Sequence, residues 1–127
     1  MTIADDTRRV AETFFAAWTR NDERAARALM ADDLEYSGPL NAYRSADELL
    51  PPLMKFAAML RGARLIELVV EGDRAALLYD CELPPPVGTL RSASFQRVEN
   101  GKIRSYLQAF DATELRKLQA RFKSEGE

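Results

Sequence analysis

The chain has 127 residues, of which 46% are hydrophobic and 30% charged, and its formal net charge is −2. These values are typical of one soluble globular domain spanning residues 1–127, and they give no reason to expect nucleic acid or a membrane as a partner. The sequence contains no histidine, which excludes histidine acid–base catalysis and most transition-metal sites. We therefore expect neither a metal nor a cofactor.

The N-terminus and the single cysteine bear on the cellular location. The chain begins "MTIADD" and no long apolar run follows, so we expect neither a signal peptide nor a membrane-spanning helix. The lone Cys81 cannot form a disulfide within the chain. Both features favour a cytoplasmic protein.

The first half of the sequence predicts helices. Residues 5–22 place apolar side chains at helical spacing, and these are Val10, Phe14, Ala17 and Trp18. Residues 23–30 predict a short second helix, and residues 32–40 a brief extended segment that stops at Gly38 and Pro39.

The third helix is less regular. Ser45 and Glu48 form a capping-box pair, but Pro51 and Pro52 would each remove a backbone donor from a helix already under way. We therefore expect a turn at 45–50 and a helix that begins at Pro51, where proline is tolerated. The expected buried stripe of this helix is Leu53, Phe56, Ala57 and Leu60, with Gly62 as its stop.

The second half predicts strands. Four strand-like runs are expected, at residues 63–70, 74–83, 88–98 and 102–110. The connecting residues are two hairpin signals and a wide proline turn, namely Gly72–Asp73, Asn100–Gly101 and Pro84–Pro86. An amphipathic helix is expected at 112–122. Helices followed by an antiparallel meander define an α+β class.

This order of elements, together with "ADDLEYSGP", "RVENGKI" and "YLQAFD", resembles the SnoaL-like family of the nuclear transport factor 2-like superfamily. That superfamily includes ketosteroid isomerase and limonene epoxide hydrolase, and the resemblance covers roughly residues 7–118. It implies a cystatin-like cone, in which N-terminal helices pack in a curved antiparallel sheet that encloses a deep apolar pocket. It also implies a homodimer formed through the outer face of the sheet. Fold alone does not specify a reaction.

Strand alternation sorts side chains between the two faces of the expected sheet. Aligned on the family by its "ENG" hairpin, the strand residues expected to face the pocket are Ala76, Leu78, Asp80, Glu82, Arg91, Ala93, Phe95, Tyr106, Gln108 and Phe110. Helical Phe14, Trp18, Phe56 and Leu60 should point into the same space, with Tyr36 and Tyr43 near its mouth. The outward set, expected to form the dimer face, is Leu77, Tyr79, Cys81, Ser94, Leu107 and Ala109.

The expected pocket suits a small, mainly apolar ligand, because it is apolar with a few converging polar groups. The residues expected to contact the ligand are Phe14, Trp18, Tyr36, Tyr43, Phe56, Leu78, Arg91, Phe95, Tyr106, Gln108 and Phe110. Asp80 is the candidate catalytic acid or base. Three interpretations of Asp80 stay open: a ligand-binding or catalytic group, a structural ion pair with Arg91 at the pocket rim, or a solvent-facing carboxylate.

Known chemistries of the family match the residues poorly. Ketosteroid isomerase needs a base, a tyrosine and a protonated acid, and the aligned positions hold Gly38, Phe14 and Ala93. Limonene epoxide hydrolase uses an Asp-Arg-Asp group to activate water and protonate the epoxide. Here Asp80 matches one acid, but Leu78 stands at the arginine position and Gln108 at the second acid. A cyclase-type aldol closure with Asp80 as base is a looser match.

Three functions are therefore compatible with the sequence. The first is a lyase, isomerase or hydrolase in which Asp80 acts as acid or base. The second is a non-catalytic dimeric module whose pocket is filled by its own side chains. The third is a carrier or sensor that binds a ligand without turnover.

Overall fold

The computed structural model describes residues 2–125, with side chains described for residues 2–120. In chain order the elements are α1 (Ile3–Thr19), α2 (Glu23–Ala28), β1 (Met30–Ser37), β2 (Ala42–Tyr43), α3 (Ala46–Ala58), β3 (Gly62–Glu71), β4 (Arg74–Glu82), β5 (Thr89–Glu99), β6 (Lys102–Phe110) and α4 (Thr113–Glu125). None of the helices in residues 2–125 is long and apolar enough to span a membrane.

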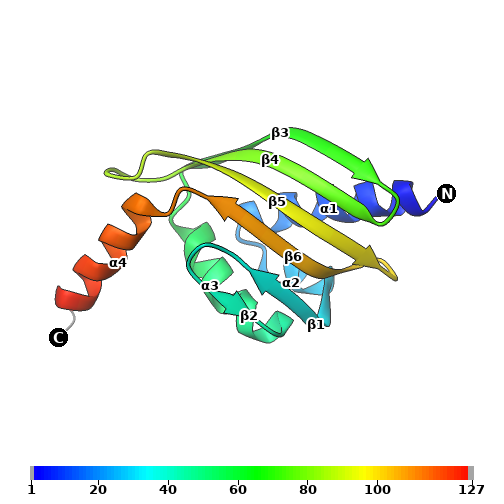
Figure 1. The fold of residues 1–127 in the computed structure, drawn as a ribbon, viewed down its shortest axis with the longest axis horizontal. Coiled ribbons are helices and arrows are strands. Elements are labelled where there is room, and N and C mark those ends of the chain that lie inside the picture. Colours follow the sequence, from blue (N-terminus) through cyan, green and yellow to red (C-terminus); the bar gives the residue numbers. More distant parts are fainter. Residues whose placement is uncertain (1, 126–127) are drawn as a thin grey trace.

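The strands form one curved sheet in the order β2-β1-β6-β5-β4-β3. β3 to β6 make the predicted antiparallel meander, whereas β1 joins β6 in parallel, with Tyr36 opposite Tyr106. Figure 1 shows α1, α2 and α3 together on one side of the sheet, while α4 projects beyond the end of β6. The predicted α+β class and the cone architecture are confirmed.

Helix α1 forms because its start is capped and one face is apolar. Thr2 Oγ1 accepts a hydrogen bond from the Asp5 amide at 3.0 Å, and the Asp5 carboxylate accepts one from the Thr2 amide at 3.1 Å. The stripe predicted from helical spacing is buried in the core, and its members are Val10, Phe14, Ala17 and Trp18. Packing of this stripe against the sheet supplies most of the stability of such a helix.

Helix α3 begins earlier than the sequence analysis predicts. It starts at Ala46, where the Ser45 hydroxyl accepts a hydrogen bond from the Glu48 amide at 3.1 Å, and it continues through Pro51 and Pro52. The predicted turn at 45–50 is therefore wrong. Ala46, Leu49 and Leu50 are buried in the first turns, and their packing outweighs the loss of the proline hydrogen-bond donors.

A β-bulge sets which side chains of the meander point inward. Val98 lies opposite Ile103, but Arg97 lies opposite Ser105, so Arg104 is an extra residue on β6. A regular two-residue hairpin would place Phe95 opposite Tyr106; here Phe95 lies opposite Leu107. A one-residue shift exchanges the two faces of a strand, and the inward set predicted for β4 and β5 is therefore wrong.

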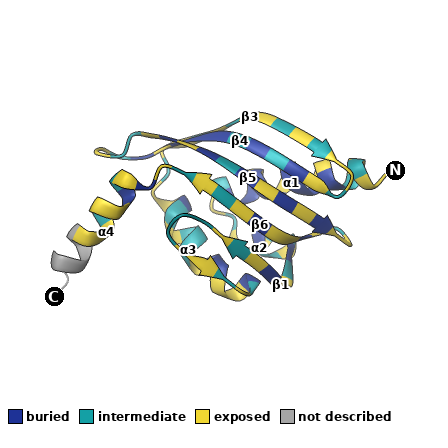
Figure 2. Cartoon of the chain, in the orientation of Figure 1, coloured by how far each residue is buried: buried dark blue, intermediate teal, exposed yellow. Residues whose placement is uncertain are grey.

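The concave face of the sheet, on the helix side, carries the opposite set of β4 and β5 residues: Ala75, Leu77, Tyr79, Cys81, Leu90, Ser92, Ser94, Gln96 and Val98. Figure 2 shows buried and exposed residues alternating along β5. On β6, Tyr106, Gln108 and Phe110 point inward and Leu107 and Ala109 outward, as predicted. Four predicted outward residues lie inside the cone instead, namely Leu77, Tyr79, Cys81 and Ser94.

Candidate functional site

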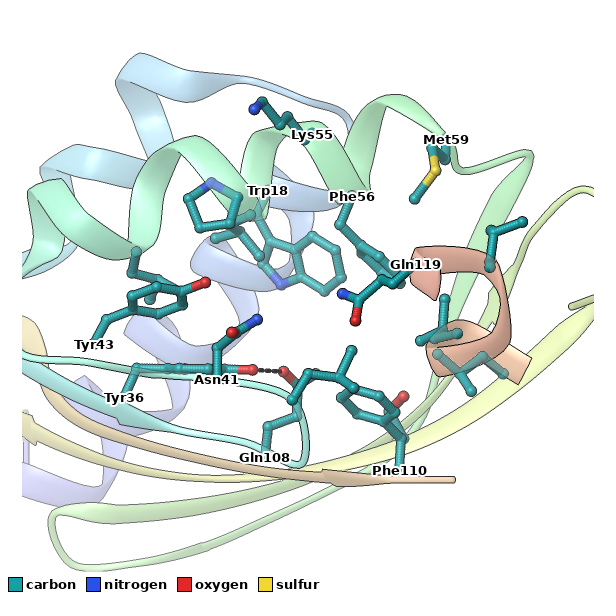
Figure 3. A pocket seen from close by; sticks show the side chains of 18 residues that line it. Trp18, Tyr36, Asn41, Tyr43, Lys55, Phe56, Met59, Gln108, Phe110 and Gln119 are labelled. Atoms are coloured by element: carbon teal, nitrogen blue, oxygen red, sulfur yellow. Dashed lines mark hydrogen bonds between the residues drawn. The ribbon is translucent and has the colours of Figure 1, made fainter. Parts of the chain in front are cut away.

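A cavity of about 340 Å³ lies between the concave face of the sheet, helix α3 and helix α4. Its wall is mostly apolar and is formed by Trp18, Leu40, Leu49, Pro52, Leu53, Phe56, Met59, Leu90, Phe110, Leu115 and Leu118. Figure 3 shows these side chains surrounding an open space. Small-molecule sites typically measure roughly 300–1,000 Å³, so the cavity is large enough for one small ligand.

Aromatic rings pack against one another in and beneath the wall of this cavity. The centroid of the Trp18 ring lies 6.2 Å from that of Phe56 and 6.0 Å from that of Tyr79. At the mouth, Tyr36 stacks on Tyr43 with 5.6 Å between centroids. Such ring pairs restrict one another's orientations, so these rings form a well-ordered part of the structure around the cavity.

A hydrogen-bonded chain of neutral side chains crosses the sheet beside the cavity. The Tyr36 hydroxyl donates to Gln108 Oε1 at 2.6 Å, and Gln108 Nε2 donates to the Tyr79 hydroxyl. Gly38 leaves room for this arrangement, because a Cβ at that position would lie 2.5 Å from the Tyr36 hydroxyl oxygen. Residues from β1, β6 and β4 therefore fix both ends of the Gln108 amide.

Burial keeps these hydroxyl groups protonated. It raises the pKa of Tyr36 to about 12 and the pKa of Tyr79 and Tyr106 well above the ordinary value for tyrosine. No carboxylate lines the cavity among the residues that the structure describes. Lys55 is the one charged lining residue in that part of the chain, and Figure 3 shows its amine directed away from the cavity. The site can donate and accept hydrogen bonds, but it presents no general base.

Asp80 lies on the convex face of the sheet, outside the cavity. Arg91 Nε and Nη2 donate to its two carboxylate oxygens at 2.8 and 3.0 Å, and Arg64 Nη2 lies 3.6 Å from Oδ2. Asp80 is only 6% exposed, and the hydrogen bonds from Arg91 lower its pKa although burial opposes them. The predicted ion pair with Arg91 is confirmed, but the predicted inward orientation of Asp80 is wrong. The bulge on β6 is the cause, because it exchanges the faces of β5 and therefore of β4.

The structure brings some of the predicted ligand contacts to the cavity and not others. Those that line it are Trp18, Tyr36, Tyr43, Phe56, Gln108 and Phe110, and their part in binding stays a prediction. Phe14 and Tyr106 are buried against each other in the core, with 5.9 Å between ring centroids. Leu78, Arg91 and Phe95 lie on the convex face, and so does Ala93, the position aligned with the isomerase acid.

Several lining residues were missed by sequence reasoning. Leu115 and Leu118 come from α4, and their spacing of three residues was a usable signal for an apolar stripe. Ser92 was missed because the face assignment of β5 was inverted. Asn41 lies in the loop before β2 and Gln119 on α4, and neither carries a sequence signal for a cavity.

Comparison with known proteins identifies the family. The SnoaL-like domain matches residues 11–106 of the chain, and a search of curated proteins found no match. A crystal structure of a protein from Kribbella flavida is 25% identical, with a TM-score of 0.81, and covers 93% of this chain and 95% of its own.

Two further crystal structures are more distant in sequence. A candidate ketosteroid isomerase from Kribbella flavida is 20% identical with a TM-score of 0.73, covering 87% of this chain and 82% of its own. An LEH-like epoxide hydrolase from M. tuberculosis is 17% identical with a TM-score of 0.74, and the match covers 90% of this chain and 89% of its own. At these identities the likeness shows the fold alone. Together with the domain match over residues 11–106, it establishes that the chain belongs to the SnoaL-like domain family and has the nuclear transport factor 2-like fold.

Proposed function

We propose that the protein binds one small, neutral and mainly apolar molecule in the cone cavity without acid–base turnover. The observation that carries this proposal is the lining of the 340 Å³ cavity, in which the described residues supply apolar surface and neutral hydrogen-bonding groups but no carboxylate. An anionic ligand would lose its hydration there without gaining a buried cation, which costs several kcal/mol.

The other two functions compatible with the sequence receive less support. A lyase, isomerase or hydrolase needs an acid or base at the reacting atoms, and Asp80 lies on the far side of the sheet from the cavity. A module whose pocket is filled by its own side chains is disfavoured by the open space itself. Binding without turnover accounts for both the space and its neutral lining.

Titration with the neutral fluorescent probe N-phenyl-α-naphthylamine tests this proposal, because its emission rises in an apolar site. We expect saturable binding at micromolar concentration. Asn41→Trp places an indole ring at the mouth and should weaken binding at least about tenfold. Asp80→Asn is the matched control on the convex face and should leave the affinity unchanged. Absence of saturable binding contradicts the proposal, and so does any turnover that Asp80→Asn abolishes.

The convex face supports a second proposal, association with another copy of the chain. Val69, Phe95 and Leu107 are each more than half exposed, and they lie in one row across β3, β5 and β6 with Ala76 between the first two. An apolar row of this kind in the middle of a sheet face is typical of an interaction surface. Sedimentation of the wild type should give the mass of two chains, and Phe95→Lys should reduce it to one. A wild-type mass of one chain at micromolar concentration contradicts the dimer.

A further inference from the structure

The Trp18 indole ring is buried, and its N–H is a hydrogen-bond donor at the cavity wall. Trp18 is 2% exposed and lines the cavity, and no side chain or carbonyl among residues 2–120 accepts a hydrogen bond from its N–H. Figure 3 shows the indole nitrogen on the edge of the ring toward Asn41 and Tyr36. A buried tryptophan N–H usually has an acceptor, and this one faces the cavity instead.

Among the described residues, the polar groups around Trp18 form no hydrogen bond with its N–H. Gln108 Oε1 accepts from Tyr36, and the Gln108 amide nitrogen donates to Tyr79. Asn41 is exposed at the mouth and forms no side-chain hydrogen bond with the described residues. The indole nitrogen can only donate, so a ligand that displaces water from it must supply a hydrogen-bond acceptor to keep it paired.

The character of that acceptor follows from its surroundings. A carboxylate is disfavoured, because the described lining residues offer no buried cation to replace its hydration. A hydroxyl oxygen could also accept this bond, but it would bring a proton that needs a second acceptor, and Gln108 Oε1 already accepts one from Tyr36. A carbonyl oxygen accepts without donating, and the apolar wall formed by Phe56 and Phe110 suits the hydrocarbon attached to it.

We propose that the Trp18 N–H donates a hydrogen bond to a carbonyl oxygen of the ligand, so that the cavity selects a neutral ketone or ester over a hydrocarbon of the same shape. This inference rests on the proposed binding function and adds to it the chemical class of the ligand. Trp18 thereby becomes the residue that determines specificity, while the remaining wall contributes apolar contact.

Displacement of N-phenyl-α-naphthylamine by α-tetralone and by tetralin tests the inference, because these two probes differ only at the carbonyl. The readout is the ratio of their affinities. Trp18→Phe enlarges the cavity for both probes, and the ratio cancels that effect. We expect Trp18→Phe to lower the preference for α-tetralone about three- to tenfold. Phe56→Leu alters the same wall without removing a donor, and it should leave the ratio unchanged.

A second measurement uses the wild type alone and does not depend on the folding of a variant. Trp18 is the single tryptophan of the chain, so its indole N–H gives one peak in a proton–nitrogen correlation spectrum. That proton resonance should move downfield when α-tetralone binds and not when tetralin binds.

The outcomes separate the two proposals. If both probes displace the dye with a ratio that does not depend on Trp18, or if the indole peak responds equally to both, the inference fails and the binding function stands. If the preference is lost with Ser92→Ala but kept with Trp18→Phe, the donor is misassigned and the inference fails. If the dye itself does not bind, the proposed function and the inference fail together.

Discussion

The two faces of the sheet carry different kinds of polar groups, neutral on the concave face and charged on the convex face. On the concave face, Tyr79 joins Gln108 and Tyr36 in a chain of neutral hydrogen bonds. One residue further along β4, on the convex face, Asp80 is held by Arg91 and Arg64, whose side chains are mostly exposed. In the described part of the chain, charged groups thus lie where water can solvate their partners, and the polar groups that point into the cone from the sheet are neutral.

Strand β5 is unusual because it places polar side chains on the concave face and a large aromatic side chain on the convex face. Its inward side chains include Ser92, Ser94 and Gln96, whereas Phe95 points outward and is 54% exposed. Within the described residues, Ser94 Oγ and Gln96 Oε1 are buried without a hydrogen-bond partner. The concave face is therefore more polar than an ordinary core, and hydrophobicity alone cannot tell which face of β5 is buried.

The difference between the two faces is tested most strongly by placing a carboxylate on each face in turn. Leu77 is buried on the concave face and Leu78 is half-buried on the convex face, and they are adjacent on β4. Leu77→Asp should lower the free energy of unfolding by at least about 3 kcal/mol, because it removes apolar contact and buries an unpaired charge. Leu78→Asp should cost about 1 kcal/mol or less. Denaturant titration measures both, and equal losses would mean that the faces are misassigned.

A smaller effect is expected when the inner network loses one hydroxyl. Tyr79→Phe keeps the ring contacts with Phe15 and Trp18 but leaves the Gln108 amide without its acceptor. We expect a loss of about 1–3 kcal/mol in the free energy of unfolding. Tyr43→Phe is the matched control, because the Tyr43 hydroxyl forms no hydrogen bond with the described residues; it should change stability by less than about 0.5 kcal/mol. Similar losses for both variants would argue against the network.

The smallest expected effect concerns the ion pair between Asp80 and Arg91 on the convex face, and it appears as a pH dependence of the free energy of unfolding. The hydrogen bonds from Arg91 lower the pKa of Asp80 in the folded state below its ordinary value of 3.8. Its contribution to stability is therefore fully present above that value and is lost as the pH falls through the lowered pKa. Between pH 6 and pH 3, wild type should lose more stability than Asp80→Asn in denaturant titrations. Parallel pH profiles would show that the pair contributes nothing measurable.

Sequence patterns were sufficient to locate buried faces and turns in segments where one hydrophobic periodicity dominates. The apolar spacing of Val10, Phe14 and Trp18 located the buried face of α1, and Asn100 and Gly101 located a hairpin whose two turn residues both have positive φ. They failed where a local irregularity has long-range effects. The extra residue at Arg104 reverses the expected faces of β4 and β5, and therefore the orientation of Asp80.

Part of the candidate site was also within reach of the sequence. Aromatic residues of the helices and of β1 and β6, such as Trp18, Tyr36 and Phe110, were assigned to the cavity without help from the structure. In the sequence, the only sign of the bulge is a pair of consecutive polar residues, Arg104 and Ser105. In the structure both are exposed, between buried Ile103 and Tyr106. A doublet of polar residues in a strand has several explanations, so the sequence could not single out this one.

The position of α4 has a practical consequence for handling the protein. Leu115 and Leu118 of this helix line the cavity, while Figure 1 shows the N-terminus at the opposite end of the molecule. An affinity tag, dye or surface linker attached after α4 would be joined to a helix that forms part of the cavity wall. The same attachment at the amino end would be joined to an element far from that wall.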